Sequence, residues 1–163
     1  MKSSVVSLDL NGAFVEFLAK PGTTLLSALR ETQGLTGTRR GCEQGTCGAC
    51  TVLVDGQPVL SCLIPVETIE GAKVETIEGI TPVQGLHPLQ EAFLEGFATQ
   101  CGFCTCGMIM AAKGLLAENP NPSRDDVVRA ISGNVCRCTG YDAIIDAILD
   151  GAKRLNAPAT AAA

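Results

Sequence analysis

Cysteine is the residue type in this sequence whose spacing predicts chemistry. Nine cysteines occur in 163 residues, and an odd number cannot pair completely as disulfides. Eight of them fall into two sets divided by a long cysteine-free stretch, so the sequence predicts two sites. The first set is Cys42, Cys47, Cys50 and Cys62, and the second is Cys101, Cys104, Cys136 and Cys138. No export signal is recognisable, which favours metal binding over disulfides.

The first set follows the pattern C-x4-C-x2-C, with its last cysteine after eleven further residues. This spacing is typical of plant-type ligation of a 2Fe-2S cluster. Each iron needs two thiolates, so the loop must curl tightly, and Gly41, Gly45 and Gly48 permit such a curl. A structural zinc site also takes four thiolates and is the alternative.

The second set consists of a C-x2-C pair and a C-x-C pair with thirty-one residues between them. Spacing alone leaves zinc, a redox dithiol and a second iron-sulfur cluster open. Each pair is expected in a turn between two helices, so two helical hairpins would bring four thiolates together. Helices beginning just after Cys104 and Cys138 would direct free N–H groups at that site.

Patterning predicts an α+β protein with two halves. The first half reads as strands at residues 5–10, 13–18, 51–54, 58–61 and 73–77, with a helix after Thr23 or Thr24 that Gly34 ends. In the second half the period becomes helical, and Leu89, Phe93 and Phe97 would share a face. Further helices are expected at 105–118, after Ser123 and after Thr139. We place the domains at 1–79 and 80–155 and expect a disordered tail at 156–163.

Composition excludes several classes of function. The chain has 12 basic and 17 acidic side chains and only six aromatic residues, which argues against nucleic-acid binding. No apolar run approaches the roughly 20 residues of a membrane helix, so we expect no membrane insertion. A cytoplasmic location is predicted, or a periplasmic one if the chain is exported together with a partner.

Three segments, GCEQGTCGACTVLVDG (41–56), QCGFCTCGMIM (100–110) and GNVCRCTGY (133–141), resemble the signatures of one family. It comprises the small iron-sulfur subunits of molybdenum hydroxylases related to xanthine dehydrogenase, and the resemblance spans residues 4–155. It implies a plant-ferredoxin-like β-grasp domain whose 2Fe-2S cluster is held by the first set of cysteines, followed by a four-helix domain whose 2Fe-2S cluster is held by the second set.

The same resemblance implies partners and a direction of electron flow. A large subunit would carry a molybdopterin cofactor, which Gln100 and Cys138 would contact, and a medium subunit would often carry FAD. Electrons would pass from molybdenum through the helical-domain cluster and the ferredoxin-like cluster to FAD or another acceptor. A dimer of such complexes is compatible with the pattern. Substrate bonds would be broken only in the large subunit.

Two other functions remain as alternatives, a free-standing two-cluster ferredoxin and a zinc-stabilised interaction module. The chain also departs from the family at Cys106, where proline is usual. Cys106 is interpreted as a free thiol, acidified by the helix N-terminus, with ligation of the helical cluster as the alternative. His87 is expected on the surface rather than as a ligand. Arg137 would tune the cluster, meet a partner or form a surface salt bridge.

Overall fold

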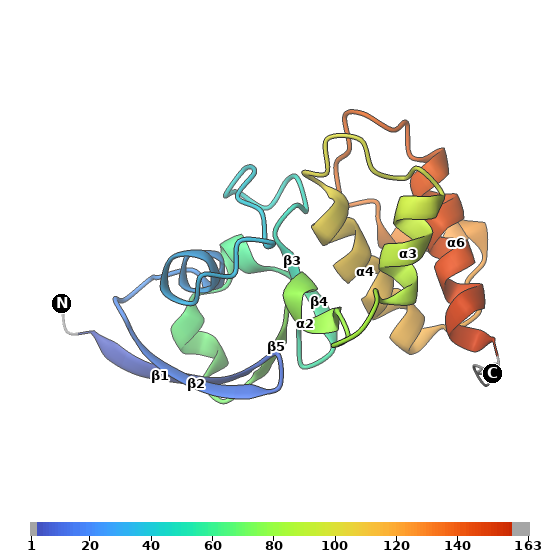
Figure 1. Cartoon of the computed structure of the whole chain (residues 1–163). Coiled ribbons are helices and arrows are strands. Elements are labelled where there is room, and N and C mark those ends of the chain that lie inside the picture. Colours follow the sequence, from blue (N-terminus) through green and yellow to red (C-terminus); the bar gives the residue numbers. More distant parts are fainter. Residues whose placement is uncertain (1–2, 158–163) are drawn as a thin grey trace.

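The computed structural model describes residues 3–157. The chain forms two lobes that lie side by side, one built on a sheet and one built from helices (Figure 1). Among the described residues, no helix combines the length and apolarity needed to cross a membrane. Strands and helices in one chain confirm the α+β class.

Within the described residues the sheet lobe contains five strands, β1 (Ser4–Leu10), β2 (Ala13–Ala19), β3 (Thr51–Val54), β4 (Gln57–Leu60) and β5 (Lys73–Glu75). Their order is β2-β1-β5-β3-β4, with β1 and β5 parallel and the other neighbours antiparallel. Asn11-Gly12 and Asp55-Gly56 join the two hairpins, and all four residues have positive φ. Such turns match the twist of the strands they connect, as the sequence predicts.

One face of this sheet is covered by α1 (Leu25–Ser27) and the π-turn η1 (Ala28–Thr32). The Thr24 side chain accepts a hydrogen bond from the Ser27 N–H at 3.2 Å and so caps α1. Leu25 and Leu29 are buried against Val6, Leu8 and the rest of the sheet core. The predicted helix therefore exists, although it changes from α to the wider π geometry at Ala28. Cys62 lies in a 3-10 turn, η2 (Ser61–Leu63), immediately beyond β4.

The helical lobe contains two helix–turn–helix units in succession, as the sequence predicts. The first pairs α3 (Pro88–Glu95) with α4 (Thr105–Glu118), and the second pairs α5 (Arg124–Ala130) with α6 (Asp142–Asn156). The cysteines of the second set lie in the two turns. A capping box of Ser123 and Asp126 opens α5. Leu89, Phe93, Met108, Ile144 and Ile148 are fully buried in the core that the helices share.

Three predictions about this lobe are wrong. The face of Leu89 and Phe93 does not continue to Phe97, because α3 ends at Glu95 and Phe97, at a φ of 51°, is 84% exposed. The last helix follows Thr139 as expected, but it does not start just after Cys138, since its first residue is Asp142. The expected tail begins too early, because α6 includes Asn156; residues 158–163 lie outside the described residues.

The two lobes are in close contact. Leu53 of β3 belongs to the core of the helical lobe, and Lys113 of α4 forms a 2.7 Å ion pair with Glu75 of β5. A Cβ on Gly114 of α4 would lie 2.2 Å from the Pro58 side chain, so only glycine allows this approach. A short helix, α2 (Ile77–Ile80), connects the lobes. The boundary between residues 79 and 80 remains a prediction.

Candidate metal centre

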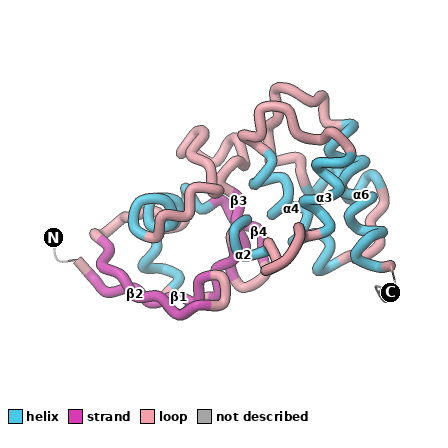
Figure 2. The backbone as a smooth tube through the Cα atoms, in the orientation of Figure 1, coloured by secondary structure: helices cyan, strands magenta, loops and turns pink. Residues whose placement is uncertain are grey.

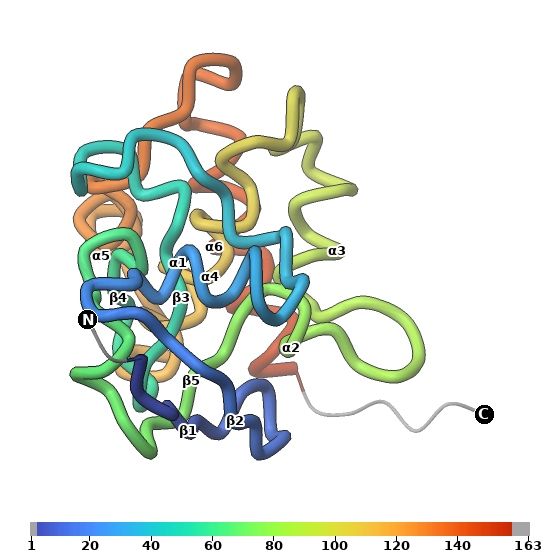
Figure 3. Tube along the Cα trace, turned by 90° about the vertical axis from the view of Figure 1, so that its left-hand side faces the viewer, coloured from blue at the N-terminus to red at the C-terminus, as the bar shows by residue number. Residues whose placement is uncertain are grey.

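The loops that carry most of the cysteines, near residues 40–50, 98–104 and 132–141, gather at one edge of the molecule (Figures 1 and 2), while Cys62 lies in η2. They remain together at the upper edge in the view turned by 90° (Figure 3). We call Cys42, Cys47, Cys50 and Cys62 the first thiol group. Cys101, Cys104, Cys136 and Cys138 are the second thiol group.

In the first thiol group, the thiols lie close enough in pairs to influence one another. After the hydrogen bonds from Thr46 and Gln44, the Cys47 side chain also lowers the pKa of Cys42, and after burial the Cys50 side chain raises the pKa of Cys62. Cys42 is partly exposed, whereas Cys50 and Cys62 are buried. The loop is closely fitted to the sulfur atoms, since a Cβ on Gly41 would lie 2.7 Å from Cys47 Sγ. The backbone of Gly45 has a φ of 80°, so the loop turns where the sequence places its glycine.

Hydrogen bonds prepare the Cys42 sulfur for negative charge. The N–H groups of Gln44 and Thr46 donate to Cys42 Sγ at 3.5 and 3.3 Å. The Thr46 side chain and then the Gln44 amide lower the pKa of the Cys42 thiol to about 6. Burial has the opposite effect on Cys62, whose pKa it raises to about 11, with Cys50 adding to the rise. A coordinating metal would deprotonate both thiols regardless of these differences.

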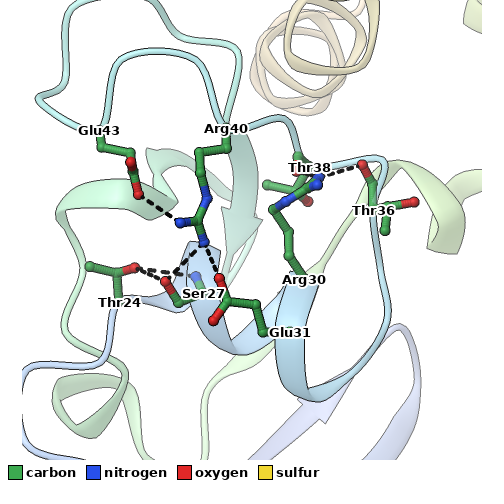
Figure 4. A network of polar contacts seen from close by, with 8 residues as sticks. All are labelled: Thr24, Ser27, Arg30, Glu31, Thr36, Thr38, Arg40 and Glu43. Carbon is green, nitrogen blue, oxygen red and sulfur yellow. Dashed lines mark hydrogen bonds and ion pairs between the residues drawn. The ribbon is translucent and has the colours of Figure 1, made fainter.

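A network of arginines fixes the segment that leads into the first thiol group (Figure 4). Arg30 Nη1 donates to the carbonyl oxygens of Thr36 and Thr38, at 2.8 Å in each case. Arg40 forms ion pairs with Glu31 of η1 and with Glu43 inside the loop, the latter at 3.2 Å. These contacts tie the loop to the helix on the sheet. Sequence reasoning missed them, because they depend on how two distant segments pack.

The second thiol group also consists of two neighbouring pairs. After burial, the Cys136 side chain adds to the rise in the pKa of Cys104, and the Cys101 side chain raises the pKa of Cys138. Cys104 is buried, and burial raises the pKa of its thiol to about 12. Cys101 and Cys138 are exposed, so this group has an inner and an outer pair.

The turn around Cys136 is held by two neighbouring side chains. Thr139 Oγ1 lies 3.2 Å from Cys136 Sγ, and the Cys136 N–H donates to the Tyr141 hydroxyl at 2.9 Å. Although burial raises the pKa of the Cys136 thiol, the hydrogen bonds from Thr139 outweigh it and the net shift is downward. Tyr141, the single tyrosine of the chain, could have been noticed from its place beside the second thiol group.

The two thiol groups are connected through the backbone. The Val135 N–H donates to the Cys47 carbonyl oxygen at 2.9 Å, and Val135 precedes Cys136 directly. Cys47 of the first group and Cys136 of the second are thus connected by one hydrogen bond and one peptide unit. In addition, the Asn134 side chain donates to the Gly48 carbonyl oxygen at 2.9 Å.

The pairwise arrangement fits a two-iron cluster better than a single ion. Within residues 3–157, no three His, Cys, Asp or Glu side chains are arranged to hold one metal ion. Around one zinc with Zn–S bonds of about 2.3 Å, all four sulfurs would lie at similar short distances from one another. A 2Fe-2S cluster instead takes four thiolates, two on each iron. Two neighbouring pairs of thiols therefore match this cluster in each group, and in the first group two backbone N–H groups also donate to sulfur.

The structure also places the other residues singled out in the sequence. Gln100 is exposed and directly precedes Cys101. Cys106 lies in the first turn of α4; burial raises the pKa of its thiol, the charge of Arg39 opposes the rise and that of Glu78 adds to it, so the expected acidification is wrong. His87 is half-buried and caps α3, with its Nδ1 accepting from the Leu89 N–H. Arg137 is exposed and forms no ion pair with another residue in 3–157.

Comparisons with known proteins agree with this arrangement. Residues 8–75 match the family described as a 2Fe-2S iron-sulfur cluster binding domain, and residues 76–149 match a second family described as a [2Fe-2S] binding domain. The chain is 46% identical to the nicotine 6-hydroxylase small subunit of Paenarthrobacter nicotinovorans, over 89% of this chain and 87% of that protein. It is 43% identical to the nicotinate dehydrogenase small FeS subunit of Eubacterium barkeri, over 86% and 90%.

Solved structures give the same result. Quinoline 2-oxidoreductase from Pseudomonas putida 86 contains a chain with a TM-score of 0.92 and 49% identity, covering 96% of this chain and 98% of that one. Aldehyde oxidoreductase from Desulfovibrio gigas superposes with a TM-score of 0.90 at 42% identity, covering 94% of this chain and 17% of the longer one.

Fold and site define an iron-sulfur protein with two 2Fe-2S domains, a ferredoxin-like domain followed by a helical one. The chain belongs to the family of small iron-sulfur subunits of the molybdenum hydroxylases, as its motifs indicate. It is thus the electron-transfer subunit of an oxidoreductase complex, in which catalysis takes place in a partner subunit.

Proposed function

We propose that this subunit connects a large molybdopterin-binding subunit to an electron acceptor, in most cases FAD on a medium subunit. Each thiol group would hold one 2Fe-2S cluster, which carries a single electron when bound. The eight ligands would be the four cysteines of each group, as the pairing within both groups supports. The observation that carries the proposal is the 2.9 Å hydrogen bond from the Val135 N–H to the Cys47 carbonyl oxygen, which joins the two groups.

The exposure of the thiols supports a direction of electron transfer through the subunit, from the second thiol group to the first. Cys101 and Cys138 form the outer pair of the second thiol group, and Gln100 beside them is exposed as well. These residues would meet the pterin cofactor of the large subunit. Cys136 is linked to the first thiol group through Val135, and in that group Cys42 and Cys47 are partly exposed whereas Cys50 and Cys62 are buried. Electrons would arrive at the outer pair of the second group and leave from the partly exposed pair of the first.

The large molybdopterin-binding subunit would determine which substrate the complex oxidises. Relatives are named for nicotine, nicotinate, quinoline and aldehydes. A free-standing two-cluster ferredoxin is less well supported, because several relatives are named as subunits. Association of two complexes into a dimer and a cytoplasmic location are further parts of the proposal, and gel filtration and cell fractionation would test them.

The test is to purify the tagged chain from its native source and count iron, labile sulfide, zinc, molybdenum and flavin per chain. We expect four irons, four sulfides, and molybdenum on a larger co-purifying chain. Cys50→Ser should abolish the EPR signal of the cluster in the first thiol group, and Cys136→Ser should abolish that of the cluster in the second. Each variant should keep the other signal. Zinc in place of iron, or full iron without molybdenum and partner, contradicts the proposal.

A further inference from the structure

A buried asparagine joins the two thiol groups directly. Asn134 is only 6% exposed, although it lies in a loop between Gly133 and the cysteines of the second thiol group. Its Nδ2 donates to the Gly48 carbonyl oxygen at 2.9 Å and approaches Thr51 Oγ1 at 3.3 Å. Gly48 belongs to the loop of the first thiol group, and Thr51 begins β3 directly after Cys50. The side chain therefore connects two loops that are 86 residues apart in the sequence.

The acceptor is the centre of a small network rather than an isolated contact. The Gly48 carbonyl oxygen also receives the Thr51 N–H at 3.1 Å and the Thr51 hydroxyl at 2.7 Å. Since the Thr51 hydroxyl both donates to Gly48 and lies within reach of Asn134, the three residues form a closed set of hydrogen bonds. Bonds of this kind strengthen one another in a buried environment.

The backbones are packed as tightly as glycine allows at this point. Gly48 has a φ of 68°, and a Cβ there would lie 2.5 Å from the Gly133 carbonyl oxygen and 2.7 Å from the Asn134 carboxamide. Gly48 adjoins Cys47, and Asn134 is two residues from Cys136. Any movement of this contact therefore moves one cysteine of each thiol group relative to the other.

We propose that Asn134 is a positioning residue that sets the separation of the two clusters, and with it the rate of electron transfer between them. The inference rests on the proposed function, since it assumes a cluster in each thiol group. The step itself moves one electron and neither makes nor breaks a bond. Asn134 donates no ligand, so each cluster should assemble without it while their separation becomes larger and less uniform.

The experiment uses the full chain purified with its clusters. Asn134→Ala removes both hydrogen bonds, and Asn134→Asp keeps the shape while placing an acceptor against the Gly48 carbonyl oxygen. Asn156→Ala is the matched control, because that asparagine is exposed and bonds to the Pro120 carbonyl oxygen on the far side of the helical lobe. Iron content, backbone hydrogen exchange and low-temperature EPR of the fully reduced protein are measured for each.

We expect iron to remain at the wild-type level in both Asn134 variants. Exchange of the Val135 amide, which bonds to Cys47, should accelerate about 5- to 30-fold, the factor expected when one or two hydrogen bonds of ordinary strength are lost. The splitting caused by the magnetic interaction of the two reduced clusters should shrink. The signal of each cluster alone, recorded after partial reduction, should keep its g values. Asn156→Ala should behave as wild type in every respect.

Two results would overturn the inference. One is unchanged splitting and unchanged Val135 exchange in both variants with the clusters present. The other is loss of either cluster from both variants, because Asn134 would then serve assembly and not separation. Failure of the proposed function looks different, since the wild-type chain itself would then lack iron. The Val135 exchange would still report whether Asn134 holds the loops together.

Discussion

A methyl group added at Gly107 should force the two thiol groups apart. Gly107 is buried in the first turn of α4, three residues after Cys104. A Cβ at this position would lie 2.4 Å from the Gly48 carbonyl oxygen and 3.2 Å from the Ala49 backbone. These atoms belong to the main chain of the first cysteine loop, so no side-chain rotation can relieve the contact. Either α4 or the loop must shift.

The sign of the effect follows from two opposing contributions. Alanine stabilises a helix interior by about 1 kcal/mol relative to glycine. Overpacking typically costs about 1–3 kcal/mol, and we expect the upper end because the obstacle is backbone. Gly107→Ala should therefore destabilise the protein by about 2 kcal/mol. For a chain of this size, that corresponds to a decrease of about 4–8 °C in the unfolding temperature.

The assay is thermal unfolding of the iron-loaded chain, followed by far-ultraviolet circular dichroism and by the visible absorbance of the clusters. Gly133→Ala provides the matched control on the opposite side of the same contact. A Cβ on Gly133 meets no atom within 4 Å, so this variant should be neutral or up to about 1 kcal/mol more stable. Both variants add one methyl group to a glycine near a cysteine.

The reasoning would be refuted if Gly107→Ala melted at or above the wild-type temperature with its clusters intact. That result would mean that α4 and the loop can separate without cost. Equal destabilisation by Gly133→Ala would also contradict it, because the effect would then arise from the loss of glycine as such. A loss confined to visible absorbance would indicate displaced ligands rather than a weakened core.

Three further predictions concern residues around the site. Cys106→Ser should leave both EPR signals intact, because the Cys106 thiol faces Arg39 and Glu78; loss of either signal would show that it is a ligand. Burial, followed by the charge of Lys113, lowers the pKa of His87, so its contribution to stability should be complete above the unfolded-state pKa of about 6.5 and decrease as the pH falls toward the lower folded-state pKa. His87→Ala should flatten the change in unfolding temperature between pH 7.5 and 5, and an unchanged slope would argue against this linkage. Arg40→Ala should cost less than about 2 kcal/mol in stability yet release iron to a chelator faster than Arg129→Ala, whose ion pair with Asp126 lies in α5; equal release rates would remove the role assigned to Arg40.

Much of the fold could be predicted because it depends on local rules. Asn11-Gly12 and Asp55-Gly56 form hairpin turns since few other residue pairs adopt two successive positive φ values. The capping box of Ser123 and Asp126 identifies the start of α5 for the same kind of reason. Periodicity failed at Phe97, because the end of a helix depends on the contacts that follow it and not on its hydrophobic pattern alone.

The candidate site divides in the same way. The number and spacing of the eight cysteines determine its chemistry. Thiolates at these spacings, on glycine-rich loops or in turns between helices, are typical ligands of iron-sulfur clusters, and this holds independently of where the loops lie in the fold. Spacing could not predict which thiols contact each other, nor that Cys101 and Cys138 are exposed while Cys104 is buried. Those properties depend on how the two helical hairpins face each other.

By itself, the sequence determined that this chain holds two groups of thiols in a sheet domain and a helical domain. Only the tertiary structure decided that the two groups lie together and that Asn134 and Val135 connect them. It also decided that Cys106 has a raised pKa, because burial outweighs the expected effect of a helix N-terminus. The reason is common to these cases. Local preferences act over a few residues, whereas separation, burial and charge depend on segments that meet only after folding.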